Sequence, residues 1–135
     1  MKRIFVLTVL ILGCLTINAQ ATCPTGQTCI VAPTATANAV GLTGTNACVS
    51  GMTCTFNFYR CVGTNAQCSL TSAVWVLANS TPTTTVAYTD TAVTPGVTYS
   101  YFADALANGL TSGPSNVATV TVPLAPSAPS IAATP

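Results

Sequence analysis

The stretch VTPGVTYSYFADALANG, residues 93–109, carries the strongest fold signal in the chain. Pro95 and Gly96 favour a tight turn, because proline presets its own φ and glycine accepts a positive φ. After the turn, the side chains alternate with the period of two that is typical of a β-strand. The expected strand has Tyr99, Tyr101, Ala103 and Ala105 on one face and Phe102 and Asp104 on the other. The stretch therefore predicts a turn followed by a strand with one apolar face.

The chain on either side of this stretch repeats the pattern of short strand-like runs and turn residues. The other expected strands are residues 39–47, 53–61, 72–79, 83–90 and 115–123. In the second of them, Phe56 and Phe58 fall on one face, and Asn57 and Tyr59 on the other. No long stripe with the helical period of 3.6 is present, and β-branched residues are frequent. Six or seven antiparallel strands in about 90 residues predict an all-β, immunoglobulin-like sandwich.

Charged residues are scarce, and this narrows the function. The chain has 135 residues, of which half are apolar, 4% are charged and none is His. Beyond residue 3, the only charged side chains are Arg60, Asp90 and Asp104. Nucleic-acid binding needs clustered Lys or Arg, and acid–base catalysis usually recruits His, Glu, Asp or Lys. We therefore expect no nucleic-acid partner, no enzymatic activity, no catalytic residue and no cofactor.

The three charged residues have structural interpretations. Asp90 stands just before a turn, where a carboxylate typically accepts backbone N–H bonds. Asp104 falls on an outward-facing strand position, so the two carboxylates are not expected to form a pair. Arg60 is expected to stack on a neighbour or cap a sheet edge, with an anion contact as the alternative.

The first 21 residues are typical of a bacterial secretory signal peptide. Two basic residues precede an apolar run over residues 4–15, and small residues suit cleavage after Ala19 or Ala21. The run is too short for a membrane span, which needs about 18–20 apolar residues. A second interpretation makes Cys14 the acylated first residue of a lipoprotein. Either way, we expect a secreted or cell-surface protein with no stable membrane span in the mature chain.

Six cysteines follow the expected leader, in three short pairs. The pairs are Cys23 with Cys29, Cys48 with Cys54, and Cys61 with Cys68, each around a Gly-bearing turn. An even number of cysteines in an exported chain indicates disulfides, although fifteen pairings are formally open. Pairing of nearest neighbours would stabilise the fold by about 2–2.5 kcal/mol for each loop. Zinc sites favour closer spacing and commonly use His, so no metal site is expected; free thiols and intermolecular links remain alternatives.

Several segments together resemble a fibronectin type III domain. VTPGVTY, SYFADALANG and SGPSNVATVTVP resemble its E–F corner, F strand and G strand, while TFNFYR and AYTDTAV resemble its C and E strands. The resemblance covers residues 33–123. It implies that Tyr99 is the corner tyrosine, whose hydroxyl bonds to upstream backbone. The family's core Trp of the B strand corresponds to Gly44, so either Trp75 or the extra disulfides fill that space, or another chain completes the first strand.

The resemblance also divides the chain and suggests its role. We expect a disulfide-closed segment at 22–32, the domain at 33–123 and a Pro/Ala/Ser-rich tail or linker at 124–135. It implies a non-catalytic module for adhesion, spacing or surface display, with a protein or polysaccharide of the cell surface as partner. The first alternative is a structural subunit that self-associates by strand exchange.

The second alternative is carbohydrate binding. Trp75, Tyr59 and Phe102 could face solvent and stack on sugar rings, or could instead cover a disulfide or a neighbouring strand. The tripeptide starting at Asn79 is also a glycosylation sequon, which matters only in a host that glycosylates such sites.

Overall fold

The computed structural model describes residues 29–30, 33–45, 48, 52–71 and 74–127, and within them there are nine strands and no helix. The strands are β1 (Cys29–Ile30), β2 (Thr34–Thr36), β3 (Ala39–Thr45), β4 (Thr55–Val62), β5 (Val76–Leu77), β6 (Ala87–Asp90), β7 (Thr98–Ala107), β8 (Leu110–Thr111) and β9 (Ala118–Thr121). The expected leader, Cys14, Cys23 and the last eight residues of the tail lie outside the described part. No helix in the described ranges is long and apolar enough to cross a membrane.

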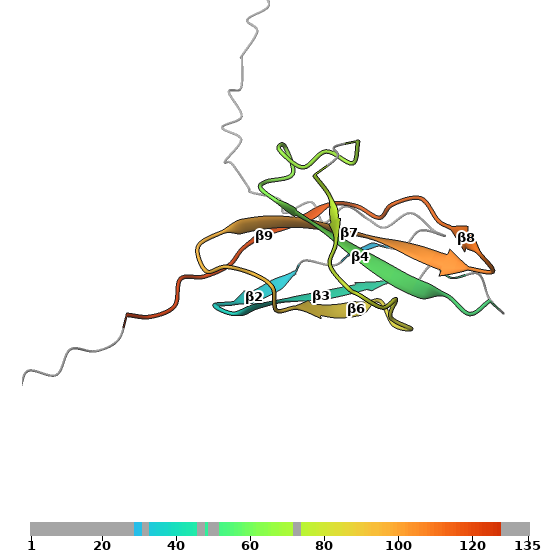
Figure 1. Cartoon of the computed structure of the whole chain (residues 1–135), viewed down its shortest axis with the longest axis horizontal. Helices are drawn as coiled ribbons and strands as arrows, with labels where there is room; N and C mark the ends of the chain where they lie inside the picture. Colours follow the sequence, from blue (N-terminus) through green and yellow to red (C-terminus); the bar gives the residue numbers. More distant parts are fainter. Residues whose placement is uncertain (1–28, 31–32, 46–47, 49–51, 72–73, 128–135) are drawn as a thin grey trace, which may run out of the picture.

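The strands form two antiparallel sheets that face one another (Figure 1). In the first sheet, β3 pairs with β1 and β2 along one edge and with β6 along the other. In the second, β4 lies between β5 and β7, and β7 also pairs with β8 and β9. The predicted all-β sandwich is confirmed. The strand count exceeds six or seven because β1, β2 and β8 are too short to show any periodicity in the sequence.

The core lies between the sheets and is built by the alternation that the sequence predicted. Phe56 and Phe58 of β4 are fully buried, as is Tyr101 of β7. They pack in one cluster with Val40 and Leu42, which alternate along β3 in the opposite sheet. Burial of such side chains contributes roughly 1.5–3 kcal/mol each relative to exposure, so this two-layer contact supplies most of the driving force for folding.

The Pro-Gly turn has the expected geometry. The N–H of Val97 donates to the carbonyl of Thr94 at 3.2 Å, which closes a four-residue turn around Pro95 and Gly96. Gly96 has a φ of 79°, a left-handed value that a side chain would strain. The turn delivers the chain directly into β7, so that Tyr99 enters the core at its second residue.

The core space that Gly44 leaves without a side chain is filled by a residue to which no sequence motif pointed. Ile30 of β1 is the Cα partner of Gly44 of β3, and cross-strand partners project to the same face of a sheet. Ile30 is buried and belongs to the core cluster. Trp75, proposed as the filler, packs instead against Phe102. That interpretation of Trp75 was wrong, because the β1–β3 register places an apolar side chain beside Gly44.

The same pairing completes the first sheet within the chain. Because β1 and β2 both hydrogen-bond to β3, the place of the first strand is filled by this chain itself, so no second chain is needed to fill it. Cys29 and Ile30 belong to the segment expected at 22–32, yet they are strand residues of the sandwich.

Candidate interaction surface

Three aromatic side chains gather on the outer face of the second sheet. Tyr59 of β4 and Phe102 of β7 are cross-strand partners, and their rings stack with centroids 4.6 Å apart at an interplanar angle of 12°. Trp75, just before β5, meets Phe102 edge to face at 4.7 Å and 80°. We call these three residues the aromatic cluster. All three are partly exposed, so the structure brings together the aromatics that the sequence marked as ligand-facing.

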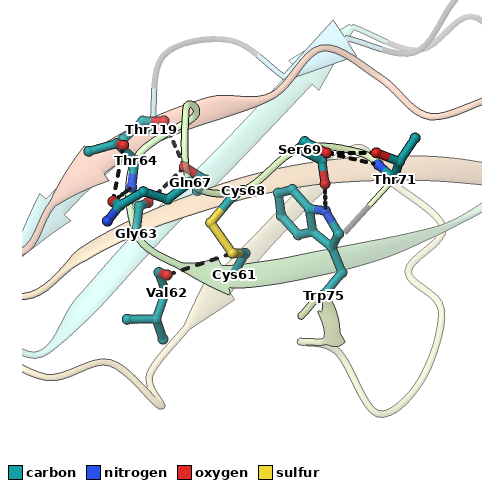
Figure 2. Close-up of a disulfide and its surroundings, with 11 residues drawn as sticks. Cys61, Val62, Gly63, Thr64, Gln67, Cys68, Ser69, Thr71, Trp75 and Thr119 are labelled. Carbon is teal, nitrogen blue, oxygen red and sulfur yellow. Dashed lines mark hydrogen bonds between the residues drawn. A yellow bond between two sulfur atoms is a disulfide. The ribbon is translucent and has the colours of Figure 1, made fainter. Parts of the chain in front are cut away.

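Trp75 is tied to the residue that directly follows the loop closed by the Cys61–Cys68 disulfide (Figure 2). Its Nε1 donates to the carbonyl of Ser69 at 2.7 Å. The disulfide joins Cys61 and Cys68, and both cysteines are buried. Trp75 therefore anchors the chain just after the disulfide loop and remains partly exposed. Its edge-to-face contact with Phe102 fits the covering interpretation, whereas a ligand-facing role stays a prediction.

The described disulfides follow the nearest-neighbour pairing. Cys48 bonds to Cys54 and Cys61 bonds to Cys68, each with a Cα–Cα distance of 6.0 Å. The third expected pair includes Cys23, which lies outside the described residues. In the described ranges, no group of three or more His, Cys, Asp or Glu side chains is placed to hold a metal ion.

Asp104 lies beside the aromatic cluster in an unusual environment. It is the cross-strand partner of Asn57, on the same outer face as Tyr59. The position is outward-facing as expected, but its neighbours leave the residue only 8% exposed. Burial raises the pKa of the Asp104 carboxyl, while hydrogen bonding from Tyr59 and Asn57 partly opposes that shift. Its Oδ1 is buried and has no hydrogen-bond partner.

Asp104 in turn affects the phenol next to it. Burial raises the pKa of Tyr59, and the negative charge of Asp104 adds to that effect. Tyr59 therefore stays protonated at physiological pH and keeps a hydroxyl donor at the border of the aromatic cluster.

Arg60 and Asp90 form an internal ion pair that links the two sheets. Nη1 of Arg60 lies 2.8 Å from Oδ2 and 3.0 Å from Oδ1 of Asp90, and 2.6 Å from the carbonyl of Ala92. The hydroxyl of Tyr101 donates to Asp90 at 3.0 Å, and the backbone N–H of Ala92 donates at 2.9 Å. The prediction that Asp90 accepts a backbone N–H is confirmed. The pair itself was missed, because thirty residues and a change of sheet separate its members.

The ion pair also affects two tyrosines of β7. Burial raises the pKa of Tyr101 strongly, and the Asp90 carboxylate raises it further. The guanidinium of Arg60 lies 5.5 Å from the ring centroid of Tyr99, within the range of a cation–π contact. The hydroxyl of Tyr99 accepts a hydrogen bond from the backbone N–H of Thr94 at 3.0 Å. Tyr99 thus ties β7 to the turn that precedes it, and Arg60 uses its charge inside the fold.

Asn79 has a structural role that conflicts with glycosylation. The residue is 3% exposed, and its Oδ1 accepts the N–H of Phe58 at 2.7 Å. Its Nδ2, the atom that would carry a glycan, donates to the carbonyls of Phe56 and Thr81. The Asn79 side chain thus hydrogen-bonds to backbone groups of β4, as a neighbouring strand would. The buried, hydrogen-bonded amide is therefore not accessible as a glycan acceptor in this fold.

Comparison with solved structures identifies the fold. An Fn3-like protein from Clostridium thermocellum matches with a TM-score of 0.52 and 21% identity, over 76% of this chain and 99% of that one. A fibronectin type III domain derived from the human KIAA0970 protein matches with a TM-score of 0.57 and 13% identity, over 82% and 85% of the two chains. Comparisons of sequence find no matching family model and no matching curated protein. The chain therefore has a fibronectin type III-like fold.

Proposed function

We propose that this fibronectin type III-like domain is a non-catalytic, exported module that serves in adhesion, spacing or surface display, and that it makes its contacts through the aromatic cluster. The observation that carries the proposal is the contrast between the interior and the surface of the described chain. Arg60 and Asp90 bond to each other and Tyr99 bonds to backbone, whereas three aromatic rings lie together at the surface.

The charge distribution supports a contact that is apolar rather than electrostatic. The three charged side chains of the described residues are all covered to a large degree, and the most accessible, Arg60, has a side chain only 20% exposed. Amphipathic rings such as Tyr and Trp supply large contact areas at interfaces. A neutral protein surface or a neutral polysaccharide suits such a face better than a polyanion does.

The disulfides support export. Structural disulfides persist in oxidising compartments and are rare in the cytosol. Two are present in the described residues, and the N-terminal sequence is typical of a cleaved leader. A secreted or cell-surface location is therefore part of the proposal, with N-terminal sequencing of the chain from the culture medium as its test.

Adhesion is tested with beads coated with the oxidised chain. We expect the beads to be retained on surfaces bearing neutral polysaccharide or protein, and Phe102→Ala to reduce retention at least about fivefold, because it removes the ring that both other aromatics contact. Leu110→Ala is the matched control, since Leu110 is 73% exposed on β8 and makes no ring contact. Equal retention of both variants would exclude the aromatic cluster as the adhesive surface.

A carbohydrate ligand is a second candidate, and the position of Asn57 favours it. A sugar ring needs an apolar surface and adjacent hydrogen-bonding groups, and Asn57 and Asp104 form the pair next to Tyr59 and Phe102 on the same face. Cellulose and chitin are the probes. Retention that Phe102→Ala and Asn57→Ala both reduce supports this ligand class. Retention of the beads on protein-coated surfaces but not on cellulose or chitin argues against it.

A further inference from the structure

Exposed apolar side chains concentrate around β5, beside the aromatic cluster. Leu70, Val74, Val76 and Leu77 lie within eight residues, and each is between 46% and 56% exposed. We call these four residues the β5 patch. Successive strand residues project to opposite faces, so Leu77 lies on the outer face with its partner Tyr59 and Val76 lies on the face of its partner Arg60. Exposed apolar side chains therefore flank both sides of this edge.

β5 is also an edge strand with one side open. It pairs with β4 through Tyr59↔Leu77 and Arg60↔Val76, and in the described chain it pairs with no other strand. The N–H of Ala78 donates to the carbonyl of Phe58. Because hydrogen-bonded pairs alternate along an antiparallel ladder, the N–H and C=O of Leu77 point away from β4. The strand therefore offers both backbone groups and apolar side chains at the same edge.

Apart from its short length of two residues, this edge lacks the features that commonly protect sheet edges from pairing. Natural edge strands are commonly protected by Lys, Pro, bulges or inward-pointing charges. Residues 74–79, VWVLAN, contain no charge and no Pro. Arg60, opposite Val76, directs its guanidinium to Asp90. A charged partner would find no complementary group here, so the occupant must itself be neutral and apolar.

We infer that two copies of this chain associate edge to edge through β5, antiparallel about a two-fold axis. A two-fold interface needs only one self-complementary patch, and every copy carries this neutral patch with the same open backbone groups. No like charge opposes the approach, since the three charged side chains of the described chain are engaged or buried. β5 has two residues, so the interface is at the small end of specific contacts and the pairing is weak and reversible.

Weak pairing gains strength where many copies are held close together. Domains displayed on one surface experience a high effective concentration, and this converts a weak contact into a persistent one. The inference goes beyond the proposed function and does not depend on it, because an adhesive monomer and a non-adhesive dimer are both physically consistent. Adhesion is measured by bead retention and pairing by molecular mass, so either proposal can be refuted without refuting the other.

The test is sedimentation equilibrium of the full oxidised chain from about 20 µM to 1 mM, a range that covers weak association. We expect the mean mass to rise from monomer towards dimer, and Leu77→Lys to weaken association at least about tenfold by placing a charge at the edge. Leu110→Lys, on β8, is the matched control and should associate as the wild type does. A wild type that stays monomeric overturns the inference, as do equal effects of the two substitutions.

Hydrogen exchange of the backbone amides gives a second measurement that needs no variant. If β5 edges pair, the Leu77 amide exchanges more slowly at 1 mM than at 20 µM by at least about threefold, while exposed loop amides are unchanged. This result decides the question should Leu77→Lys fail to fold, as judged by circular dichroism. Exchange at Leu77 that is independent of concentration, with a mass that still rises, would assign the association to a different surface or occupant.

Discussion

Replacing Arg60 by Met should destabilise the domain far more than loss of an ordinary surface ion pair. The substitution removes three contacts of Nη1 at 2.6–3.0 Å and leaves the Asp90 carboxylate 1% exposed, with only the Tyr101 hydroxyl and the Ala92 N–H as donors. Removing one partner of a buried pair typically costs about 3–5 kcal/mol. Since the Arg60 side chain is one-fifth exposed and Asp90 keeps two donors, we expect Arg60→Met to lower the free energy of unfolding by about 3 kcal/mol, the lower end of that range.

The assay is denaturant unfolding followed by Trp and Tyr fluorescence, together with thermal melts. For a domain of this size, about 3 kcal/mol lowers Tm by roughly 15 °C. Val62→Met is the control two residues along β4; Val62 is 68% exposed, so its change should stay within about 0.5 kcal/mol. In a double-mutant cycle with Asp90→Asn, we expect a coupling of about 2 kcal/mol. A cost below about 1 kcal/mol, or additive single changes, would refute the assignment of a buried pair.

Three further changes test the corner, the disulfide and the buried carboxyl. Tyr99→Phe should cost about 1–2 kcal/mol in denaturant unfolding, because the Thr94 N–H loses its acceptor; no change would deny the hydroxyl a structural role. The double change Cys61→Ser and Cys68→Ser should cost about 2.5 kcal/mol on the loop-entropy account, and reduction of this variant should add nothing at this site, because no disulfide remains there to break. The folded-state pKa of Asp104 is raised, so its ionisation opposes folding and wild-type stability should fall as pH rises above about 4; Asp104→Asn should remove this slope and be the more stable form at pH 7.

The sequence predicted the parts of the fold that local chemistry determines. Alternation in β4 correctly placed Phe56 and Phe58 on one face, which the structure shows to be the buried one, and the Pro95–Gly96 dipeptide correctly placed the turn before β7. In each case the residues concerned lie within a few positions of one another. The spacing of Cys61 and Cys68 is equally local, which is why their pairing could be predicted.

The missed features depend on pairing between distant strands. Ile30 lies beside Gly44 only because of the β1–β3 register. The two residues of β1 are too few to show the alternation from which a strand is predicted. Asn79 satisfies backbone groups of β4, whereas its tripeptide alone indicates a sequon. Asp104 occupies the outward position that alternation assigned, yet stacked neighbours bury it. Local pattern gives the direction of a side chain, and tertiary packing decides whether solvent reaches it.

The candidate surface was predictable in its members but not in its arrangement. Tyr59, Phe102 and Trp75 were each marked by their ring chemistry, but the Tyr59↔Phe102 register that stacks them follows from the β4–β7 pairing. The open edge at Leu77 left no signal, because VWVLAN is equally consistent with a central, fully paired strand.

The salt dependence of bead retention tests most directly the claim that this domain uses its charges internally and makes contacts through a neutral aromatic surface. Beads coated with the oxidised chain would be assayed from about 20 mM to 1 M NaCl, a range over which the screening length falls from roughly 20 Å to 3 Å. Retention that is constant or slightly increased, and that remains sensitive to Phe102→Ala at every salt concentration, is the predicted result. A steady loss of retention with added salt would contradict the account.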